Sequence, residues 1–265
     1  MNLTNQSRGQ SIALLRRRLL AGGVDAEELR LLADDPRKGV RDLLRRMERI
    51  AEGERREDER LRTLSRHESA LWARGVVHIA GVDEAGAGPL AGPVVAAAVI
   101  LKPGARLRGV DDSKKLSAKA RERLEKVIRA EAVAVALGQC SAIEIDENNI
   151  FQAGRLAMQR AVMGLRTAPD YLLVDARVVP DVQAPQRAIV HGDAHSMSIA
   201  AASIIAKVER DRQLEALAAR YPGYGFERHR GYGTAHHLKA LRELGPCPEH
   251  RQSFAPVREA ALRRN

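Results

Sequence analysis

The sequence predicts an α/β domain preceded by a small helical appendage. After residue 75, short apolar runs typical of strands alternate with segments of helical periodicity, and two of these runs lead into acidic residues. Before residue 75 the chain is arginine-rich and only helical in pattern. With 265 residues, 45% of them hydrophobic, the chain can form one well-packed domain, 76–265, and an appendage, 1–75. Acids at strand ends predict a ligand crevice at the carboxyl edge of the sheet.

The appendage carries apolar residues at helical spacing in two segments. They are Ile12, Leu15 and Leu19 in the first, and Leu43, Met47 and Ile50 in the second. Gly22-Gly23 and Asp35-Pro36 interrupt the pattern, so we predict two to four helices, the last of them long, charged and ending near Trp72. Acidic residues nearly balance the arginines within 48–66, which favours solvated, salt-bridged helices. The alternative is an additional contact with nucleic acid.

A predicted strand at 76–80 leads directly into the stretch 81–94, GVDEAGAGPLAGPV. Near its start this stretch carries two adjacent acids, Asp83 and Glu84. Adjacent carboxylates raise each other's pKa unless a cation lies between them, which suggests a divalent metal. Consecutive residues of a regular strand point to opposite faces, so both acids reach one metal only if the strand ends or twists there. The alternative is a solvated Asp-Glu pair before a Gly/Pro loop.

Three glycines follow the acids. We expect Gly86, Gly88 and Gly92 to take backbone conformations closed to other residues and to place main-chain N–H groups against a phosphate or sugar. Acids for a metal beside such glycines suggest chemistry on a phosphodiester. A dinucleotide-binding turn would have the spacing G-x-G-x-x-G and a helix directly after it, whereas here a second strand is predicted at 93–101.

The rest of the domain alternates helices and strands. Further strands are predicted at 132–139, 171–175 and 187–190, and helices at 118–130, 148–165 and 198–220, before a Gly/Tyr/His-rich loop and a final helical segment. Ser117 is the expected N-cap of the first helix, and Tyr221-Pro222-Gly223 ends the third. The run 171–175 is typical of a strand buried on both faces.

Two more acids join the candidate site. Asp175 closes the strand 171–175, and Asp193 lies just before the helix 198–220. If the strands bearing Asp83 and Asp175 are neighbours, three or four carboxylates meet at one edge and form a site for hard cations such as Mg²⁺. Two such ions activate a water and stabilise a leaving 3′ oxygen. Taken alone, Asp193 is better explained as a helix cap.

The charge of the chain favours a polyanionic partner. It carries 44 Lys and Arg against 34 Asp and Glu, a net charge of +10. No apolar run approaches the ~20 residues of a membrane span, and residues 1–10 lack the apolar core of a signal peptide. We therefore expect a cytoplasmic protein with no membrane partner. Cys140 and Cys247 have no metal-binding spacing and are expected to be reduced.

These motifs closely resemble bacterial ribonuclease HII, a type 2 ribonuclease H, from residue 76 to about 260. The matching stretches are GVDEAGAGPLAGPV (81–94), DDSKKLS (111–117), LLVDA (172–176), GDAHSMSIAAASIIAKVERD (192–211) and YPGYGFERHRGYGT (221–234). The appendage, with DPRKGV at 35–40, resembles the N-terminal extension of some bacterial members. The resemblance implies an RNase H-like mixed sheet flanked by helices, a helical C-terminal segment and a monomer.

The resemblance also implies an activity. It is Mg²⁺- or Mn²⁺-dependent cleavage of the RNA strand of RNA–DNA hybrids, with incision on the 5′ side of single ribonucleotides in duplex DNA. The ends left are 3′-hydroxyl and 5′-phosphate, so the enzyme would start the removal of ribonucleotides from DNA. By position, the catalytic and metal-binding acids fall on Asp83, Glu84, Asp175 and Asp193, and a junction-sensing tyrosine falls on Tyr232. An aromatic ring stacked on a sugar-phosphate suits that role.

The segment Gly86-Ala87-Gly88 departs from the family, whose members normally carry Gly-Arg-Gly. We expect its backbone to contact the ribose 2′-hydroxyl, which both donates and accepts hydrogen bonds. The missing arginine removes a charge-assisted contact of ~1.5–3 kcal/mol, so weaker substrate binding is expected, with the chemistry retained.

Other polar residues are weaker candidates. Ser113, Lys114 and Lys207 are candidate phosphate contacts, each weighed equally against a solvated surface group. A general-acid role is considered, and less favoured, for four of the eight histidines: His191, His195, His236 and His237. Two alternative functions stay open: a module that binds hybrids without cutting, and a ribonuclease H restricted to long hybrids because of Ala87. Retention of all four acids argues against the first.

Overall fold

The computed structural model describes residues 10–263. The expectation that residues 1–10 contain no signal peptide therefore falls, except for Gln10, outside the described residues. The chain divides into two compact units, Met1–Arg60 and Leu61–Asn265, and the boundary lies within α3 (Lys38–Leu64). Within residues 10–263, no helix combines the length and apolar character needed to span a bilayer.

The first unit contains α1 (Ile12–Leu20), α2 (Ala26–Ala33) and most of α3. Its core is formed by Leu15, Leu32, Val40 and Leu43. Ile12 and Ile50 were expected in the apolar stripes, but each is 42% exposed. Three short elements can bury only a narrow seam of each helix, so the stripe ends stay in solvent. Arginine–glutamate ion pairs on α3 agree with the expected salt-bridged surface.

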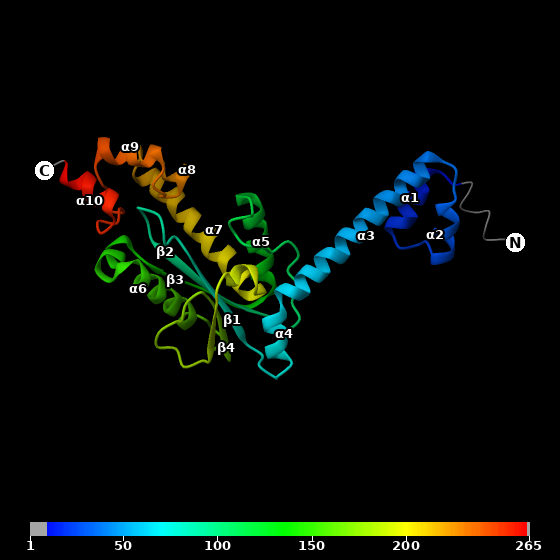
Figure 1. Ribbon diagram of the computed structural model, residues 1–265, viewed down its shortest axis with the longest axis horizontal. Coiled ribbons are helices and arrows are strands. Elements are labelled where there is room, and N and C mark those ends of the chain that lie inside the picture. Colours follow the sequence, from blue (N-terminus) through cyan, green and yellow to red (C-terminus); the bar gives the residue numbers. More distant parts are fainter. Residues whose placement is uncertain (1–9, 264–265) are drawn as a thin grey trace. The chain divides into compact units, whose positions relative to one another are not determined.

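The second unit is built on a five-stranded mixed sheet (Figure 1). Its strands are β1 (Ile79–Ala85), β2 (Val94–Leu101), β3 (Ala132–Cys140), β4 (Tyr171–Asp175) and β5 (Gln186–Ile189). In the order β3-β2-β1-β4-β5, β1 pairs antiparallel with β2 and parallel with β4. The mixed sheet flanked by helices is therefore confirmed.

Helices cover both faces of the sheet. One face packs against α6 (Ala142–Met163), and the other packs against α5 (Ala118–Glu131) and α7 (Met197–Arg220). Leu61 and Leu64 of α3 belong to the core under α7, so the compact unit begins earlier than residue 76. The short α4 (Arg66–Trp72) follows α3. The C-terminal segment is helical, with α8 (Phe226–His229), α9 (Ala235–Leu244) and α10 (Ala255–Leu262).

The approach of α7 to β1 is set by small residues. A Cβ atom added to Gly81 of β1 would lie 2.0 Å from the carbonyl carbon and 2.2 Å from the carbonyl oxygen of Ser198 on α7. Glycine is therefore the only residue that fits this contact without moving the helix. The alanines at the start of α7 are fully buried beside it, as the small-residue pattern of that helix suggested.

Three local expectations were wrong. The helix predicted from residue 148 begins at Ala142 with a Ser141–Glu144 capping box. It is interrupted at Asn149, whose φ is 62° and whose Oδ1 accepts hydrogen bonds from the N–H groups of Phe151 and Gln152, so only its second part was recognised. The strand predicted at 76–80 instead spans Ile79–Ala85. Ser196, not Asp193, caps α7 through the N–H of Ile199.

Candidate active site

Two parallel neighbouring strands bring acidic residues to one edge of the sheet. Val82 of β1 pairs with Val174 of β4, so the next residues along the two strands are Asp83 and Asp175. This confirms the condition on which the predicted carboxylate cluster depended. The carboxyl ends of parallel strands meet at the same edge, where ligands of open α/β sheets bind.

Asp83 and Glu84 leave β1 on opposite faces of the sheet. Asp83 lies on the α7 side, where it bonds to Ser203, and its Oδ1 accepts the N–H of Glu84 at 2.7 Å. Glu84 Oε1 lies 3.1 Å from Nη2 of Arg177, which comes two residues after Asp175. Because β1 continues through Ala85, the strand does not end before Glu84 and the alternation of side chains is retained. The expectation that the strand ends before both acids is therefore wrong, and in this arrangement Asp83 and Glu84 do not point towards one and the same ion.

Asp193 reaches the same edge from the turn before α7. This turn is the 3-10 helix η2 (Gly192–Ala194). The N–H of Gly192 donates to Asp175 Oδ1 at 2.7 Å, which ties the turn to β4. Asp193 is only 6% exposed, and its Oδ2 lies 3.3 Å from Nζ of Lys114. Strand end and turn are thus held together by a hydrogen bond from a main-chain N–H group to the Asp175 carboxylate.

Burial and mutual repulsion perturb the acids. Burial raises the pKa of Asp83 well above its usual value, and the charges of Glu84 and Asp175 raise it further. Burial also raises the pKa of Glu84, although the Arg177 guanidinium opposes this. The pKa of Asp175 is raised mainly by burial, with Asp193 adding to it. Asp83, Glu84 and Asp175 are therefore costly to ionise together unless cations join them.

The donor set of this edge fits a hard divalent cation. All four groups offer carboxylate oxygens, which Mg²⁺ and Mn²⁺ prefer. Oε2 of Glu84 is buried and has no hydrogen-bond partner within the described residues. In residues 10–263, however, no three acidic, histidine or cysteine side chains already stand close enough to hold a metal. Arg177 and Lys114 instead draw Glu84 and Asp193 towards themselves.

The glycine loop lies beside the predicted junction-sensing tyrosine. Gly86 and Gly92 have φ values of 98° and 79°, as expected, whereas Gly88 does not adopt a positive φ, so that part of the prediction was wrong. A Cβ added to Gly88 would lie 3.7 Å from Cε1 of Tyr232. Tyr232 is 47% exposed. The structure therefore brings these two distant motifs together with an accessible aromatic ring.

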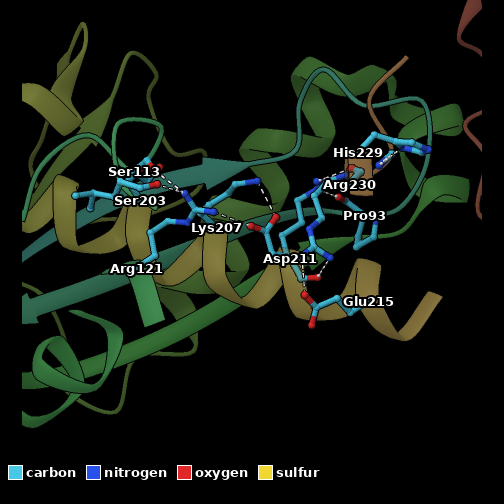
Figure 2. A network of polar contacts seen from close by, with 12 residues as sticks. Pro93, Ser113, Arg121, Ser203, Lys207, Asp211, Glu215, His229 and Arg230 are labelled. Atoms are coloured by element: carbon cyan, nitrogen blue, oxygen red, sulfur yellow. Dashed lines mark hydrogen bonds and ion pairs between the residues drawn. The ribbon is translucent and has the colours of Figure 1, made fainter. Parts of the chain in front are cut away.

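The three candidate phosphate contacts already have protein partners. Ser113 is buried, and its hydroxyl lies 2.9 Å from that of Ser203, the residue that also bonds Asp83. Lys207 donates to Asp211 on the same helix at 2.7 Å, and burial lowers its pKa (Figure 2). Lys114 is mostly exposed and bridges Asp112 and Asp193. Of the three, only Lys114 both faces solvent and contacts a candidate catalytic acid.

Arg177 is a site residue that the sequence reading missed. Besides pairing with Glu84, its guanidinium carbon lies 5.2 Å from the ring centroid of Phe151, and its Nη1 is buried with no partner among the described residues. The signal in the sequence that could have identified Arg177 is its position two residues after Asp175, the acid that ends β4.

A buried histidine pair supports the main chain of Tyr232. The N–H of Cys247 donates to Nδ1 of His250 at 2.9 Å, and Nδ1 of His237 lies 3.0 Å from the carbonyl oxygen of Tyr232. Because an N–H only donates and a carbonyl only accepts, His250 Nε2 must donate to His237 Nε2 across 3.0 Å. Both rings are neutral, and burial lowers both pKa values to about 4. His237, considered as a general acid, therefore has both ring nitrogens engaged.

Comparisons with known proteins identify the family of the chain. The family model of ribonuclease HII matches residues 80–257, and that of the ribonuclease HII N-terminal domain matches residues 11–72. The chain is 57% identical over 233 residues to the ribonuclease HII of Myxococcus xanthus, covering 88% of this chain and 80% of the relative. It is 54% identical over 237 residues to that of Geobacillus kaustophilus, covering 89% and 91%.

Solved structures share the fold. The ribonuclease H2 of Pyrococcus horikoshii OT3 has 30% sequence identity and a TM-score of 0.61, over 70% of this chain and 97% of that chain. Bst-RNase HIII, solved in complex with Mn²⁺, has 22% identity and a TM-score of 0.56, over 74% of each chain. The catalytic sheet, its acidic edge and both family models converge on one assignment: the chain belongs to the ribonuclease HII family and is an enzyme of the ribonuclease H type.

Proposed function

We propose that this ribonuclease H cuts the RNA strand of RNA–DNA hybrids and incises duplex DNA on the 5′ side of a single embedded ribonucleotide. The observation that carries the proposal is the position of Tyr232 beside Gly88 in the loop that follows the acidic edge, where a Cβ added to Gly88 would lie 3.7 Å from Cε1 of the tyrosine ring. Backbone groups at Gly88 suit recognition of a 2′-hydroxyl, and an exposed aromatic ring suits stacking on the neighbouring sugar. A ribonucleotide joined to DNA presents both features at one step.

Asp83, Glu84, Asp175 and Asp193 are the proposed ligands of Mg²⁺ or Mn²⁺. Bound there, the ions supply an activated water and neutralise charge on the phosphate. The four carboxylates would hold the ions in place, and the positively charged ammonium group of Lys114 lies at the rim of the site beside Asp193. The reaction forms a bond from water oxygen to phosphorus, breaks the bond from phosphorus to the 3′ oxygen, and transfers a proton to that oxygen. The products are a 3′-hydroxyl and a 5′-phosphate.

The proposal extends to the setting of the enzyme. We place residues 76–265 as the catalytic domain and 1–75 as an extension, and infer a cytoplasmic monomer that starts the removal of ribonucleotides from DNA. The net charge of +10 supports a nucleic-acid substrate, because Lys and Arg displace counterions from phosphates.

A nicking assay tests the proposal. Duplexes with one ribonucleotide, with four consecutive ribonucleotides and with none are incubated with Mg²⁺, with and without EDTA. We expect cleavage of the first two only, loss of cleavage with EDTA, and loss with Asp83→Asn. Binding of the two ribonucleotide-containing duplexes without any cut would identify a hybrid-binding module. Cleavage of the four-ribonucleotide duplex alone would support the alternative that Ala87 restricts the enzyme to long hybrids.

A further inference from the structure

The loop between β1 and β2 lies over two buried arginines. Arg210 of α7 is 1% exposed and Arg251, just before α10, is 0% exposed. Buried cations normally pair with carboxylates. Within residues 10–263 neither arginine forms an ion pair, and their hydrogen bonds all go to main-chain carbonyl oxygens. Burial lowers their pKa values to about 10 and about 9, so both remain cations at neutral pH.

Arg251 holds three carbonyl groups of the loop. Its Nη2 donates to Gly86 O at 2.7 Å and to Gly92 O at 2.9 Å. Its Nη1 donates to Ala87 O at 3.1 Å, and its Nε also reaches Gly92 O, at 3.0 Å. One planar guanidinium therefore fixes successive peptide planes at Gly86 and Ala87 from the buried side of the loop.

The direction of these carbonyls determines the direction of the N–H groups. In a trans peptide the C=O and N–H bonds are antiparallel. The N–H of Ala87 shares a peptide with Gly86 O, and the N–H of Gly88 shares one with Ala87 O, so both point away from Arg251. Neither N–H has an acceptor among the described residues, and Gly88 is exposed. Both donors therefore point away from Arg251, and one of them belongs to Gly88, which lies beside Tyr232.

We propose that Arg251, with Arg210, is a positioning residue that aims the N–H groups of Ala87 and Gly88 at the ribose and phosphate of the substrate. This inference rests on the proposed function. The two arginines also place two positive charges under a loop that lacks the family arginine, at the point where a phosphate would bind. Neither residue touches the substrate in this arrangement; each acts through the loop.

Arg210 couples this loop to the tyrosine loop. It donates from Nε to Pro93 O and from Nη1 to Arg230 O, both at 3.1 Å, and Figure 2 shows Pro93 and Arg230 at this junction. A Cβ added to Gly86 would lie 2.1 Å from Arg210 Nε, so the glycine leaves room for the guanidinium as well as supplying a positive φ. One side chain therefore links the predicted 2′-hydroxyl contact to the segment that carries Tyr232.

Arg251→Lys tests the inference, because lysine keeps the charge but cannot reach three carbonyls at once. The measurements are kcat and KM on the one-ribonucleotide duplex, and Kd with Ca²⁺ for that duplex and its all-DNA counterpart. We expect kcat/KM to fall by about tenfold or more. We also expect the binding preference for the ribonucleotide duplex to fall towards one, since the ribose is the only feature contacted by the loop that the all-DNA duplex lacks. Arg212→Lys, two residues after Arg210 and paired with Glu125 of α5, is the matched control and keeps wild-type values.

The outcomes separate this inference from the proposed function. If the wild type fails to cut the one-ribonucleotide duplex, the proposed function fails. If the wild type cuts it and Arg251→Lys keeps both the wild-type kcat/KM and the wild-type binding preference, only the positioning role is overturned. A variant that binds both duplexes equally more weakly, with its preference intact, also overturns it, because that is the effect of general destabilisation.

A second measurement uses only the wild type, so it still tests the inference if Arg251→Lys unfolds easily. In the ¹⁵N-labelled wild type, the amide signals of Ala87 and Gly88 should shift when the ribonucleotide duplex is added with Ca²⁺, and shift little with all-DNA duplex. Equal shifts with both duplexes, or no shift with either, would contradict the proposal that these N–H groups are aimed at the ribose.

Discussion

Replacing Gly81 with alanine should separate α7 from β1 and disturb the acidic edge. The added Cβ would lie 2.0 Å from Ser198 C, 2.2 Å from Ser198 O and 2.4 Å from Ile199 N, which are all main-chain atoms of a buried helix. Ordinary contact between carbon atoms is about 3.5 Å, so the elements must move apart by roughly 1.5 Å. Overpacking of this kind costs about 3 kcal/mol. For a unit of this size that lowers Tm by roughly 6–12 °C.

The same shift should impair cleavage below Tm, because Asp83 lies two residues from Gly81 and bonds to Ser203 of the displaced helix. Gly138→Ala is the matched control. Its Cβ would meet Ala157 O at 2.2 Å and Ala161 N at 2.4 Å, a similar clash between β3 and α6 on the other face of the sheet. We expect a comparable loss of stability in this control, with kcat retained at 25 °C.

Thermal unfolding and single-turnover cleavage at 25 °C measure the two effects. The reasoning is refuted if Gly81→Ala melts within about 2 °C of the wild type. It is also refuted if both glycine variants lose stability equally and keep equal activity, because the position of α7 would then not govern the acids.

Three further predictions concern charge and metal. Ala87→Arg should tighten binding of the one-ribonucleotide duplex by about tenfold or more, and an unchanged Kd would show that the loop needs no arginine. The pKa values of about 4 for His237 and His250 lie below their unfolded value, so the unfolded chain binds more protons between pH 4 and 6.5. Stability should fall by about 3 kcal/mol for each of the two histidines as pH drops through that window; denaturant melts of His250→Asn should show a weaker dependence, and an identical one would contradict the neutral pair. Mg²⁺ at 100 times its Kd should stabilise the wild type by about 2.7 kcal/mol, and calorimetry should show most of this lost in Asp83→Asn.

The sequence predicted the catalytic sheet well because its signals are local. Apolar runs such as 171–175 and 93–101 are long and uninterrupted, and Ser117 caps its helix as expected. The pairing of β1 with β4 was only a condition for the predicted cluster of acids, and the structure meets it. The convergence of Asp83, Asp175 and Asp193 was therefore within reach of sequence reasoning, although their roles as ligands stay a prediction.

Features that depend on long-range packing could not be predicted. The partners of Arg210 and Arg251 are carbonyl oxygens more than 100 positions away, except for Arg230 O, and main-chain acceptors leave no mark on the sequence. The sequence prediction missed the start of α6 because Asn149 interrupts the helix. The helix resumes after it because the Asn149 side chain accepts a hydrogen bond from the N–H of Phe151. The exposure of Ile12 depends on how little of a short helix its neighbours can cover.

In the proposed reaction, the acidic edge directs water to the phosphate on the 5′ side of a ribonucleotide. Cleavage of the one-ribonucleotide duplex in H₂¹⁸O with Mg²⁺, followed by mass spectrometry of the ends, follows the oxygen of that water. We expect one ¹⁸O atom in the 5′-phosphate that precedes the ribonucleotide and an unlabelled 3′-hydroxyl on the upstream DNA. A 2′,3′-cyclic phosphate on the ribonucleotide, or a 5′-phosphate without ¹⁸O, would contradict the proposed reaction.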